Sequence, residues 1–535
     1  MQKRVFTLFL PMQGHKAYTE KLFTSFQLSS RVPEHNVYRR LKAQLDLEFL
    51  RKQTRSYYGS EGQCSIDPVV FFKLILVGYL ENLNSDRKII DHCSMRLDIM
   101  YFLGYDIDEE LPWHSTLSRT RQLYGEEVFR SLFKEVLRLC ISKGMVSGKR
   151  QALDSAYIKA NASMDSVAEK ALTDDIMYDA ETYAGELEHE NQRQDKQKQT
   201  VSLQKKQEVE LHHKWKEVEY KNQHKLRRNK EGEVDEHGNL IRPKYLSNHT
   251  HYSTTDPDAR IAVKPGKPRQ FYYSAQTVVD TASHVITNIV ADYSDKRDSQ
   301  SLPLAISQAN AQLQENGLQM QELLADTAYS SGESLQYLEE NNLTGYIPNF
   351  GQYKPTREGF VYNAEKDQYQ CTQGHKATIP YRKTITDSKG YTKKIYRSDN
   401  SKCKNCPLRN QCIGKSDFKK IEDSIAKPYY DRMHQRLQTT KAKRMKKLRS
   451  STVEPVLGTL INFTGMRRIW TRGIAGAGKF MLGAATAYNL KKWLNYKVTK
   501  VKTGAMIKLR EELTLLESRF IQQILLPLQL TKIFN

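Results

Sequence analysis

Length, composition and charge exclude several classes of protein. The chain has 535 residues, 39% hydrophobic and 10% aromatic, so it is long and apolar enough for three or four folded domains of about 150 residues each. Its 83 Lys and Arg against 61 Asp and Glu give a formal net charge of +22. This excludes an acidic or neutral housekeeping enzyme and makes a polyanion, by default nucleic acid, the expected partner. The longest apolar stretch, 66–80, contains Lys73 and is shorter than the ~18 residues of a membrane span, so we expect a cytoplasmic protein without a membrane partner.

Residues 1–145 predict a helical domain. Asp67 is suited to cap a helix that begins at Pro68, and Ser115 is suited to cap a second helix from which Arg119 and Arg121 would project. Short helices with an arginine-bearing last helix are typical of a helix-turn-helix DNA reader. A helical packing domain with solvated arginines is an equally weighted alternative.

The pattern changes to an α/β alternation after residue 145. Residues 151–158 predict a strand with Asp154 near its centre, and a second predicted strand, 322–326, ends in an aspartate. Between and after them we expect a charged helical insertion at 166–230, a hairpin over 271–291, a helix over 303–316, a helix from Ser331 and a strand over 343–347. This order predicts an α/β domain with a sheet of mixed strand directions.

Asp154 and Asp326 are candidates for chemistry because aspartate is disfavoured in strands and costly to bury. A hard cation such as Mg²⁺ or Mn²⁺ would relieve the repulsion between two neighbouring carboxylates, and two such ions could activate and stabilise the oxygens of a phosphodiester. A third carboxylate is normally needed. The aspartates near the hairpin lie in turns or at strand ends and are assigned structural roles: Asp280, Asp292, Asp295 and Asp298.

Four of the seven cysteines lie close together, at Cys371, Cys403, Cys406 and Cys412. A CxxC pair with two further thiolates is typical of a structural Zn²⁺ site, although the last spacing of five residues leaves reduced cysteines without metal as an alternative. The other three are expected to be small core residues: Cys64, Cys93 and Cys140.

The basic charge is concentrated near the C-terminal end. Residues 401–450 hold 15 Lys and Arg against 4 Asp and Glu, a net charge of +11 that is half of the chain's total and predicts a surface for DNA phosphates. Just after it, Arg467, Arg468 and Arg472 surround Trp470, which either stacks on an unpaired base or packs in the core. The glycines of 473–479 are not followed by Ser or Thr, so we exclude a phosphate-binding loop and nucleotide hydrolysis. A helix is expected over 484–494.

Several segments, in order, resemble the DDE transposases of bacterial insertion sequences, in the branch with an InsH-type N-terminal domain. The resemblance covers most of the chain and is carried by these segments: 31–35 (RVPEH), 67–68 (DP), 112–119 (PWHSTLSR), 153–163 (LDSAYIKANAS), 253–259 (STTDPDA), 274–280 (SAQTVVD), 324–331 (LADTAYSS) and 449–458 (RSSTVEPVLG).

The resemblance implies an α/β RNase H-like mixed-sheet catalytic core, a helical N-terminal domain, and helical and zinc-ribbon-like insertions. It adds the third carboxylate, Glu454, to Asp154 and Asp326 as ligands of two Mg²⁺ or Mn²⁺ ions, with Arg449 on the same helix contacting DNA. The implied domains are a DNA-binding domain (1–145), the first part of the core (146–165), a charged helical insertion (166–250), the rest of the core (251–365), a Cys-rich zinc-ribbon-like insertion (366–415), the basic region carrying Glu454 (416–500) and a helical tail (501–535).

The function implied is that of a transposase that binds terminal inverted repeats in double-stranded DNA, cleaves the element end and joins it to target DNA. The protein would act as a homodimer and associate with the bacterial nucleoid when bound to DNA. The sequence departs from the family at Lys446 and Ile461, where the family often has Tyr and Lys, so Arg467 or Arg468 substitutes for the lysine or the chemistry is altered. The alternatives are a nuclease with the same core but no strand transfer, and a non-catalytic DNA-binding relative.

Overall fold

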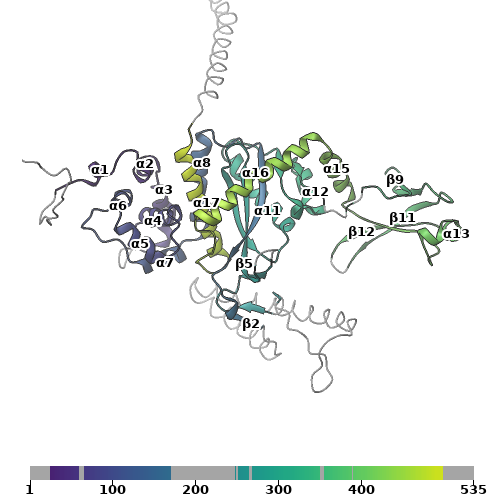
Figure 1. Ribbon diagram of the computed structural model, residues 1–535, viewed down its shortest axis with the longest axis horizontal. Coiled ribbons are helices and arrows are strands. Elements are labelled where there is room, and N and C mark those ends of the chain that lie inside the picture. Colours follow the sequence, from purple (N-terminus) through teal and green to yellow (C-terminus); the bar gives the residue numbers. More distant parts are fainter. Residues whose placement is uncertain are drawn as a thin grey trace, which may run out of the picture.

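The computed structural model describes residues 25–59, 65–169, 247–248, 251–263, 268–349, 353, 355–387 and 390–497. Cys64, most of the predicted charged insertion and the predicted C-terminal tail lie outside the described residues. A helical N-terminal region, a central sheet with its helices and a second sheet follow one another along the longest axis of the molecule (Figure 1). None of the described helices is long and apolar enough to cross a membrane.

The N-terminal region is helical, as predicted. Asp67 accepts a hydrogen bond from the Val69 N–H and Pro68 occupies the first turn, which confirms the predicted start of α4. Most of this helix is buried among its neighbours. The helices are α1 (Leu28–Arg31), α2 (Val37–Gln44), α3 (Phe49–Thr54), α4 (Pro68–Leu80), α5 (Asp86–Ser94), α6 (Leu97–Leu103), α7 (His114–Leu123) and α8 (Glu126–Ser142), with a 3₁₀ turn η1 (Arg55–Tyr57).

Helix α7 differs from its prediction in two ways. It begins at His114, with Trp113 in the cap position and no side-chain cap, so Ser115 lies inside the first turn. Arg119 is exposed, but Arg121 turns inward and donates two hydrogen bonds, of 2.8 and 2.6 Å, to the carboxylate of Asp86 at the start of α5. Arg121 therefore joins α7 to α5 instead of projecting toward a partner.

The central sheet has six strands of mixed direction. Its strands are β1 (Arg150–Lys159), β4 (Arg260–Ala262), β5 (Gln270–Asp280), β6 (Ile286–Tyr293), β7 (Glu322–Leu324) and β8 (Thr344–Tyr346). The order is β4-β5-β1-β7-β8, with β6 also pairing with β5. β5 is antiparallel to both β1 and β6, whereas β7 and β8 run parallel to β1. The predicted strands and hairpin are confirmed. A short separate ladder joins β2 (Val167–Glu169) to β3 (His251–Ser253), next to the 3₁₀ turn η2 (Met164–Ser166).

Helices cover this sheet and complete its core. They are α11 (Asp298–Gln314), α12 (Gly332–Glu340), α15 (Lys427–Leu437), α16 (Thr440–Phe463) and α17 (Ile474–Asn495), with the 3₁₀ turn η3 (Thr327–Tyr329) after β7. α11 begins five residues before its predicted start, because the Gln300 side chain accepts the Arg297 N–H at 3.1 Å and Pro303 is accommodated inside the helix. α16 contacts β1, β5, β7 and β8, and α17 contacts α4, α8 and β6.

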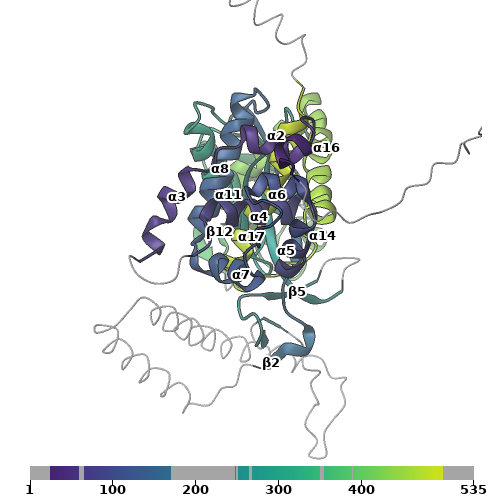
Figure 2. The same ribbon diagram turned by 90° about the vertical axis from the view of Figure 1, so that its left-hand side faces the viewer.

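One hydrophobic core joins the N-terminal helices, the central sheet, α16 and α17. α17 is buried over almost its whole length, and Asn489 exchanges two hydrogen bonds with the backbone of Ile286 at the sheet edge, 3.0 and 2.8 Å long. Figure 2, seen from the end that carries the N-terminal region, shows α4 and α5 in front of α17. α17 begins at Ile474, ten residues before its predicted start, so 474–479 are helical and form no phosphate-binding loop, as expected.

The Cys-rich region is part of a five-stranded antiparallel sheet that extends beyond the predicted range of 366–415. Its strands, in the order β13-β12-β11-β10-β9, are β9 (Phe360–Asn363), β10 (Gln368–Cys371), β11 (Thr378–Thr386), β12 (Thr392–Arg397) and β13 (Lys420–Ser424). Two short helices, α13 (Asn400–Lys404) and α14 (Arg409–Cys412), lie between β12 and β13. The sheet has its own small core of Tyr369, Ile379, Tyr396 and Ile421.

Candidate active site

Strand register brings Asp154 and Asp326 together. In the parallel pairing of β1 with β7, Ala152 lies opposite Leu324. Continuing this register by two residues places Asp154 beside Asp326, which follows the end of β7. Asp154 is 17% exposed and points to the face of the sheet that α16 covers, because Arg449 of α16 contacts it.

The surroundings of Asp154 raise its pKa above the ordinary value for an aspartate. Burial is the largest cause, Arg449 opposes it, and the negative charge of Asp326 adds to it. Asp326 itself caps η3, where one carboxylate oxygen accepts the Ala328 N–H at 3.0 Å. Its other oxygen has no partner among the described residues. The two aspartates therefore lie close enough for the charge of Asp326 to act on Asp154.

Glu454 reaches the same place from α16. This helix is capped by Thr439, which accepts the Ala442 N–H at 3.2 Å, and is held against β1 by buried residues that include Val453 and Val456. Glu454 lies on the exposed side of the helix, with its side chain 58% exposed. The site thus combines the largely buried carboxylate of Asp154, that of Asp326 after the end of β7 and the exposed one of Glu454.

Arg449 lies between two of these acids. Its Nη1 donates to Asp154 Oδ2 at 2.7 Å, and its Nη2 donates to Glu454 Oε1 at 3.2 Å and to Ser450 Oγ at 3.3 Å. The guanidinium side chain is only 15% exposed. Arg449 was expected to contact DNA, whereas in the structure it pairs with the carboxylates of Asp154 and Glu454.

The carboxylate oxygens of the three acids are ligands of the kind that a hard divalent cation binds, but they do not surround one common point. Mg²⁺ and Mn²⁺ prefer carboxylate oxygens, and Asp326 and Glu454 each retain an oxygen that accepts no hydrogen bond from the described residues. Within the described ranges, no group of three or more His, Cys, Asp or Glu is placed to hold a metal ion. Since Arg449 occupies the space between Asp154 and Glu454, a cation there requires the guanidinium to leave.

Tyr329 is a buried member of this region that the sequence did not single out. Its hydroxyl donates to Gln276 Oε1 at 2.5 Å, and Gln276 in turn donates to Asp298 at 3.0 Å. Burial raises the pKa of Tyr329 well above its ordinary value, and the charges of Asp298, Asp154 and Asp326 raise it further. The phenol therefore stays protonated and stands behind the acids as a fixed donor. The run 327–329 following Asp326 was its only signal in the sequence.

The aspartates assigned structural roles make structural contacts. Asp280 is fully buried and accepts hydrogen bonds from the N–H groups of Gly148 and Ala282 at 2.9 and 2.8 Å. Asp292 accepts the Ser301 hydroxyl at 2.7 Å and pairs with Lys296 at 2.8 Å. Asp295 pairs with Arg260 at 3.6 Å, and Asp298 accepts a hydrogen bond from the Gln276 side chain at 3.0 Å.

The arginines and tryptophan expected to bind DNA lie in the loop between α16 and α17. The loop is tied to the far end of β1, where the Ile469 N–H donates to the Lys159 carbonyl at 2.8 Å and Asn161 donates to the Trp470 carbonyl at 3.0 Å. Five residues of strand separate Lys159 from Asp154, roughly 17 Å. Trp470 is 42% exposed, which excludes the core-packing alternative, and Arg468 lies over its ring at 4.8 Å. Arg467 and Arg472 are exposed.

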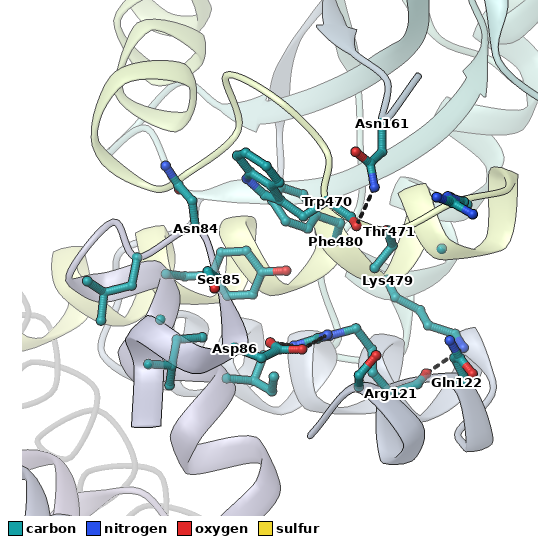
Figure 3. Close-up of a pocket in the computed structure, with 18 of the residues that line it drawn as sticks. Asn84, Ser85, Asp86, Arg121, Gln122, Asn161, Trp470, Thr471, Lys479 and Phe480 are labelled. Carbon is teal, nitrogen blue, oxygen red and sulfur yellow. Dashed lines mark hydrogen bonds and ion pairs between the residues drawn. The ribbon is translucent and has the colours of Figure 1, made fainter. Parts of the chain in front are cut away.

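A cleft of about 860 Å³ opens between this loop, α17 and the N-terminal helices (Figure 3). Trp470 and Phe480 line it on one side, and the Asp86–Arg121 ion pair lies on the other. Lys479, also in the wall, is buried and donates to the Arg121 carbonyl at 3.0 Å, and its burial lowers its pKa. The cleft therefore combines aromatic and cationic groups where the helical region meets the sheet.

The four cysteines line one cavity of about 270 Å³ in the second sheet region, together with His375. Cys371 donates to the Gln373 carbonyl at 3.0 Å, and Cys403 accepts the Ser398 hydroxyl at the same distance. These thiols are free, but within the described ranges no group of three or more His, Cys, Asp or Glu is placed to hold a metal ion. The predicted core cysteines Cys93 and Cys140 are buried.

The fold and site define a mixed α/β protein with a helical N-terminal region and a cluster of sheet and helix carboxylates. Residues 26–123 match the family described as Transposase domain (DUF772), and residues 370–494 match the family described as Transposase DDE domain. These two matches support a DDE insertion-sequence transposase, a family that acts on DNA and generally uses divalent metal ions. A search of curated proteins found no match. The second match contains Arg449 and Glu454, whereas Asp154 and Asp326 precede it.

Proposed function

We propose that the protein binds the terminal inverted repeats of its insertion sequence, cleaves the DNA there and joins the freed end to target DNA. The observation that carries this proposal is the approach of Asp154, Asp326 and Glu454 from three distant segments, with Arg449 bridging two of them. A merely DNA-binding relative would have no need to keep a half-buried, repelling pair of aspartates, since burying them costs free energy.

The strand order supports an RNase H-like core. An antiparallel trio of β1, β5 and β6 continues through β1 into the parallel strands β7 and β8. This arrangement puts the centre of β1 and the end of β7 side by side, where a helix packed on the sheet can bring a third acid. We infer that the sheet, α11, α12 and α16 together form this core, and that the sheet of β9 to β13 is an insertion between its last strand and α16.

Each site residue has a distinct proposed role. Asp154, Asp326 and Glu454 would hold two divalent cations, which when bound activate the attacking oxygen and stabilise the leaving oxygen of a phosphodiester. Asp154 is fixed by its strand and by the Ser155 N–H, which donates to it at 2.8 Å, so its position changes little. Glu454 is exposed on one turn of a helix and can adjust its rotamer. Tyr329 holds the sheet surface behind the acids through Gln276.

DNA would be held by two groups of cations. Lys443, Arg444, Lys446 and Lys447 are exposed on α16 and have no acidic partner in the described part of the chain. Arg467, Arg468 and Arg472 in the α16–α17 loop, with Trp470 available for stacking, form the second group. Ile461, where the family often has lysine, packs against the hydrophobic core. Arg467 or Arg468 of the α16–α17 loop would therefore supply the positive charge that the family often has at the position of Ile461.

The experiment is an assay of strand cleavage and joining with labelled element ends and Mg²⁺. Joined products support the transposase, cleavage without joining supports the nuclease alternative, and retention without cleavage supports the DNA-binding alternative. Asp154→Asn, Asp326→Asn and Glu454→Gln are each expected to lower the cleavage rate at least about a hundredfold. Glu315→Gln, which removes an exposed carboxylate far along the surface, is the matched control and should keep the rate. Unchanged cleavage in all three site variants would refute the assignment.

Two copies are proposed to act together, because two element ends must be joined coordinately. The charged segment proposed for this contact lies outside the described residues. Sedimentation of the protein with and without a repeat duplex tests the stoichiometry: two chains per pair of ends are expected, and one chain per end contradicts the proposal.

The Zn²⁺ proposal rests on the sharing of one cavity by Cys371, Cys403, Cys406 and Cys412. In support of it, none of the four is in a disulfide. Metal analysis of the purified protein should find about one Zn²⁺ per chain, falling in Cys406→Ser but not in the core variant Cys140→Ser. Less than half an equivalent in the unmodified protein would exclude the site.

A further inference from the structure

Arg449 occupies the position from which a cation would contact both Asp154 and Glu454. Its two η nitrogens lie 2.7 and 3.2 Å from oxygens of these acids, and only 15% of the side chain is exposed. A guanidinium is planar and presents its donors as a rigid fork, so it suits this bridging position better than a lysine would. The single guanidinium thereby holds the two carboxylates near each other.

We propose that Arg449 is a stand-in cation that DNA displaces, so that the acids take up divalent metal tightly only after DNA has bound. The inference rests on the proposed metal-dependent function of this site and concerns a positioning residue of it. In the free protein Arg449 neutralises Asp154 and Glu454 and competes with the metal. In the complex with DNA, the guanidinium of Arg449 contacts a DNA phosphate instead. The carboxylates of Asp154 and Glu454 then become available to bind the metal.

The surface of α16 beside Arg449 is positively charged and can bind the DNA backbone that carries such a phosphate. Lys446 lies three residues before Arg449, one helical turn away, and is exposed; Lys447, Arg444 and Lys443 continue the positive surface along α16. A DNA backbone held by these side chains would pass the mouth of the site, where Glu454 is 58% exposed. Phosphate accepts the same two-donor contact that a carboxylate does. Arg449 can therefore exchange acceptors by moving its side chain alone.

The exchange couples two binding events. If DNA removes a competitor of the metal, DNA raises the affinity for the metal, and by thermodynamic reciprocity the metal raises the affinity for DNA by the same factor. The coupling has a function: a nuclease site that takes up metal poorly without DNA is protected from loading before its substrate is in place.

The test measures Mn²⁺ binding to the full chain by electron paramagnetic resonance of free Mn²⁺, with and without a DNA duplex that the protein retains. In the unmodified protein the duplex should increase the Mn²⁺ affinity about tenfold or more, the size expected for releasing two partly buried ion pairs. Arg449→Gln should bind Mn²⁺ about tenfold more tightly than the unmodified protein without DNA, and its gain from DNA should fall below about threefold.

Two further variants separate displacement from a general effect of charge. Arg444→Gln removes the same charge five residues earlier on α16, where the side chain is exposed and contacts neither acid. It should weaken DNA binding yet leave the Mn²⁺ affinity without DNA unchanged. Arg449→Lys keeps the charge but cannot bridge both carboxylates, so its Mn²⁺ affinity should lie between those of the unmodified protein and Arg449→Gln.

Each remaining outcome has a defined meaning. Equal Mn²⁺ affinity of the unmodified protein and Arg449→Gln, or an equal rise in Arg444→Gln, overturns the stand-in role while leaving the proposed site intact. Arg449→Lys indistinguishable from the unmodified protein shows that charge alone acts, which also overturns it. Absence of Mn²⁺ binding in every variant, with DNA present, counts against the proposed function itself. Circular dichroism of each variant establishes that the fold is retained.

Discussion

Asp154 and Asp280 lie in adjacent strands of one sheet, yet their surroundings differ in the number of donors. Asp280 is fully buried and accepts the Gly148 and Ala282 N–H groups and the Gln151 side chain at 2.8 to 2.9 Å. Asp154 accepts one backbone N–H, from Ser155, and the guanidinium of Arg449. The first carboxylate is satisfied by fixed backbone donors, whereas the second depends on a side chain that can leave. This difference distinguishes a structural aspartate from a candidate ligand.

Asp280→Asn should destabilise the protein without entering the chemistry of the site. An amide places a donor where Asp280 faces N–H groups from several directions, so at least one buried donor loses its acceptor. We expect the free energy of unfolding to fall by about 2 kcal/mol, measured by chemical denaturation. Asp295→Asn, at an exposed contact with Arg260, is the control and should change it by less than about 0.5 kcal/mol. Equal effects of both variants would contradict the structural assignment of Asp280.

His284, in the turn between β5 and β6, gives a pH dependence of stability. Burial lowers its pKa below 6.5, the positive charge of Lys492 on α17 lowers it further, and Asp280 on β5 opposes them. A lowered pKa in the folded state means that the stability contribution is present above pH 6.5 and is lost as the pH falls through the lowered value.

The variant His284→Asn isolates this contribution, because asparagine tolerates the positive φ of 56° at this position. The unfolding midpoint of the unmodified protein should decline more steeply between pH 7 and pH 5 than that of the variant. Parallel declines in thermal scans of the two proteins would show that His284 has no part in it.

At the scale of the element, α16 has two functions along one helix. Its first half carries exposed lysines and arginines, and its middle carries Arg449 and Glu454 on the side that meets β1 and the solvent. The net charge of +11 over 401–450 overstates the free positive surface, because some of its cations pair with acids outside this range, as Arg432 does with Glu339 and Lys441 with Glu322. The cations of α16 next to the candidate site have no acidic partner among the described residues: Lys443, Arg444, Lys446 and Lys447.

Removal of the four α16 cations should reduce the salt dependence of DNA binding. Each phosphate contact contributes roughly 0.9 to the slope of log K against log salt, so Lys443→Gln, Arg444→Gln, Lys446→Gln and Lys447→Gln together should lower its magnitude by about 3.6. The matched control replaces four exposed lysines of the second sheet region: Lys366, Lys383, Lys404 and Lys415. Filter-binding titrations over a range of salt concentrations measure both slopes. A similar loss in the two proteins would mean that binding responds to total charge and not to α16.

At the scale of the whole molecule, α17 joins the helical N-terminal region to the sheet. It contacts α4 and α8 on one side and β6 on the other, and its glycines permit the close approach. A Cβ added at Gly483 would lie 2.3 Å from the ring of Tyr79, which is itself packed edge-on against Phe480 at 5.3 Å between ring centres. The relative position of the N-terminal helices and the acids therefore depends on the absence of a side chain at Gly483.

Gly483→Ala should accordingly shift α4 or its tyrosine ring and destabilise the protein by about 1 to 3 kcal/mol, the usual range for overpacking. Gly458→Ala, on an open surface of α16, is the control and should be neutral or slightly stabilising. Thermal unfolding compares the two. Should Gly483→Ala melt at the temperature of the unmodified protein, the contact between α4 and α17 is looser than these distances imply.

The local signals in the sequence predicted most elements correctly. Asp67 before Pro68, Ser331 before α12 and the alternation around Asp154 each reflect an interaction within a few residues, namely a cap or a strand pattern. Errors arose where the decisive contact was distant: Arg121 was expected outside but pairs with Asp86, and α17 begins ten residues early because its glycines pack against other helices.

The sequence by itself determined that the chain is basic, that it is built of helices followed by a mixed α/β region, and that Asp154 and Asp326 belong together; its resemblance to a family added Glu454. Only the tertiary structure decided where Arg449 points. A guanidinium at that position of the helix can reach either solvent or the sheet, and the choice depends on carboxylates that come from elsewhere in the chain. Residue types and spacing record local preferences, whereas the neighbours of a side chain across the fold are set by the packing of α16 on β1.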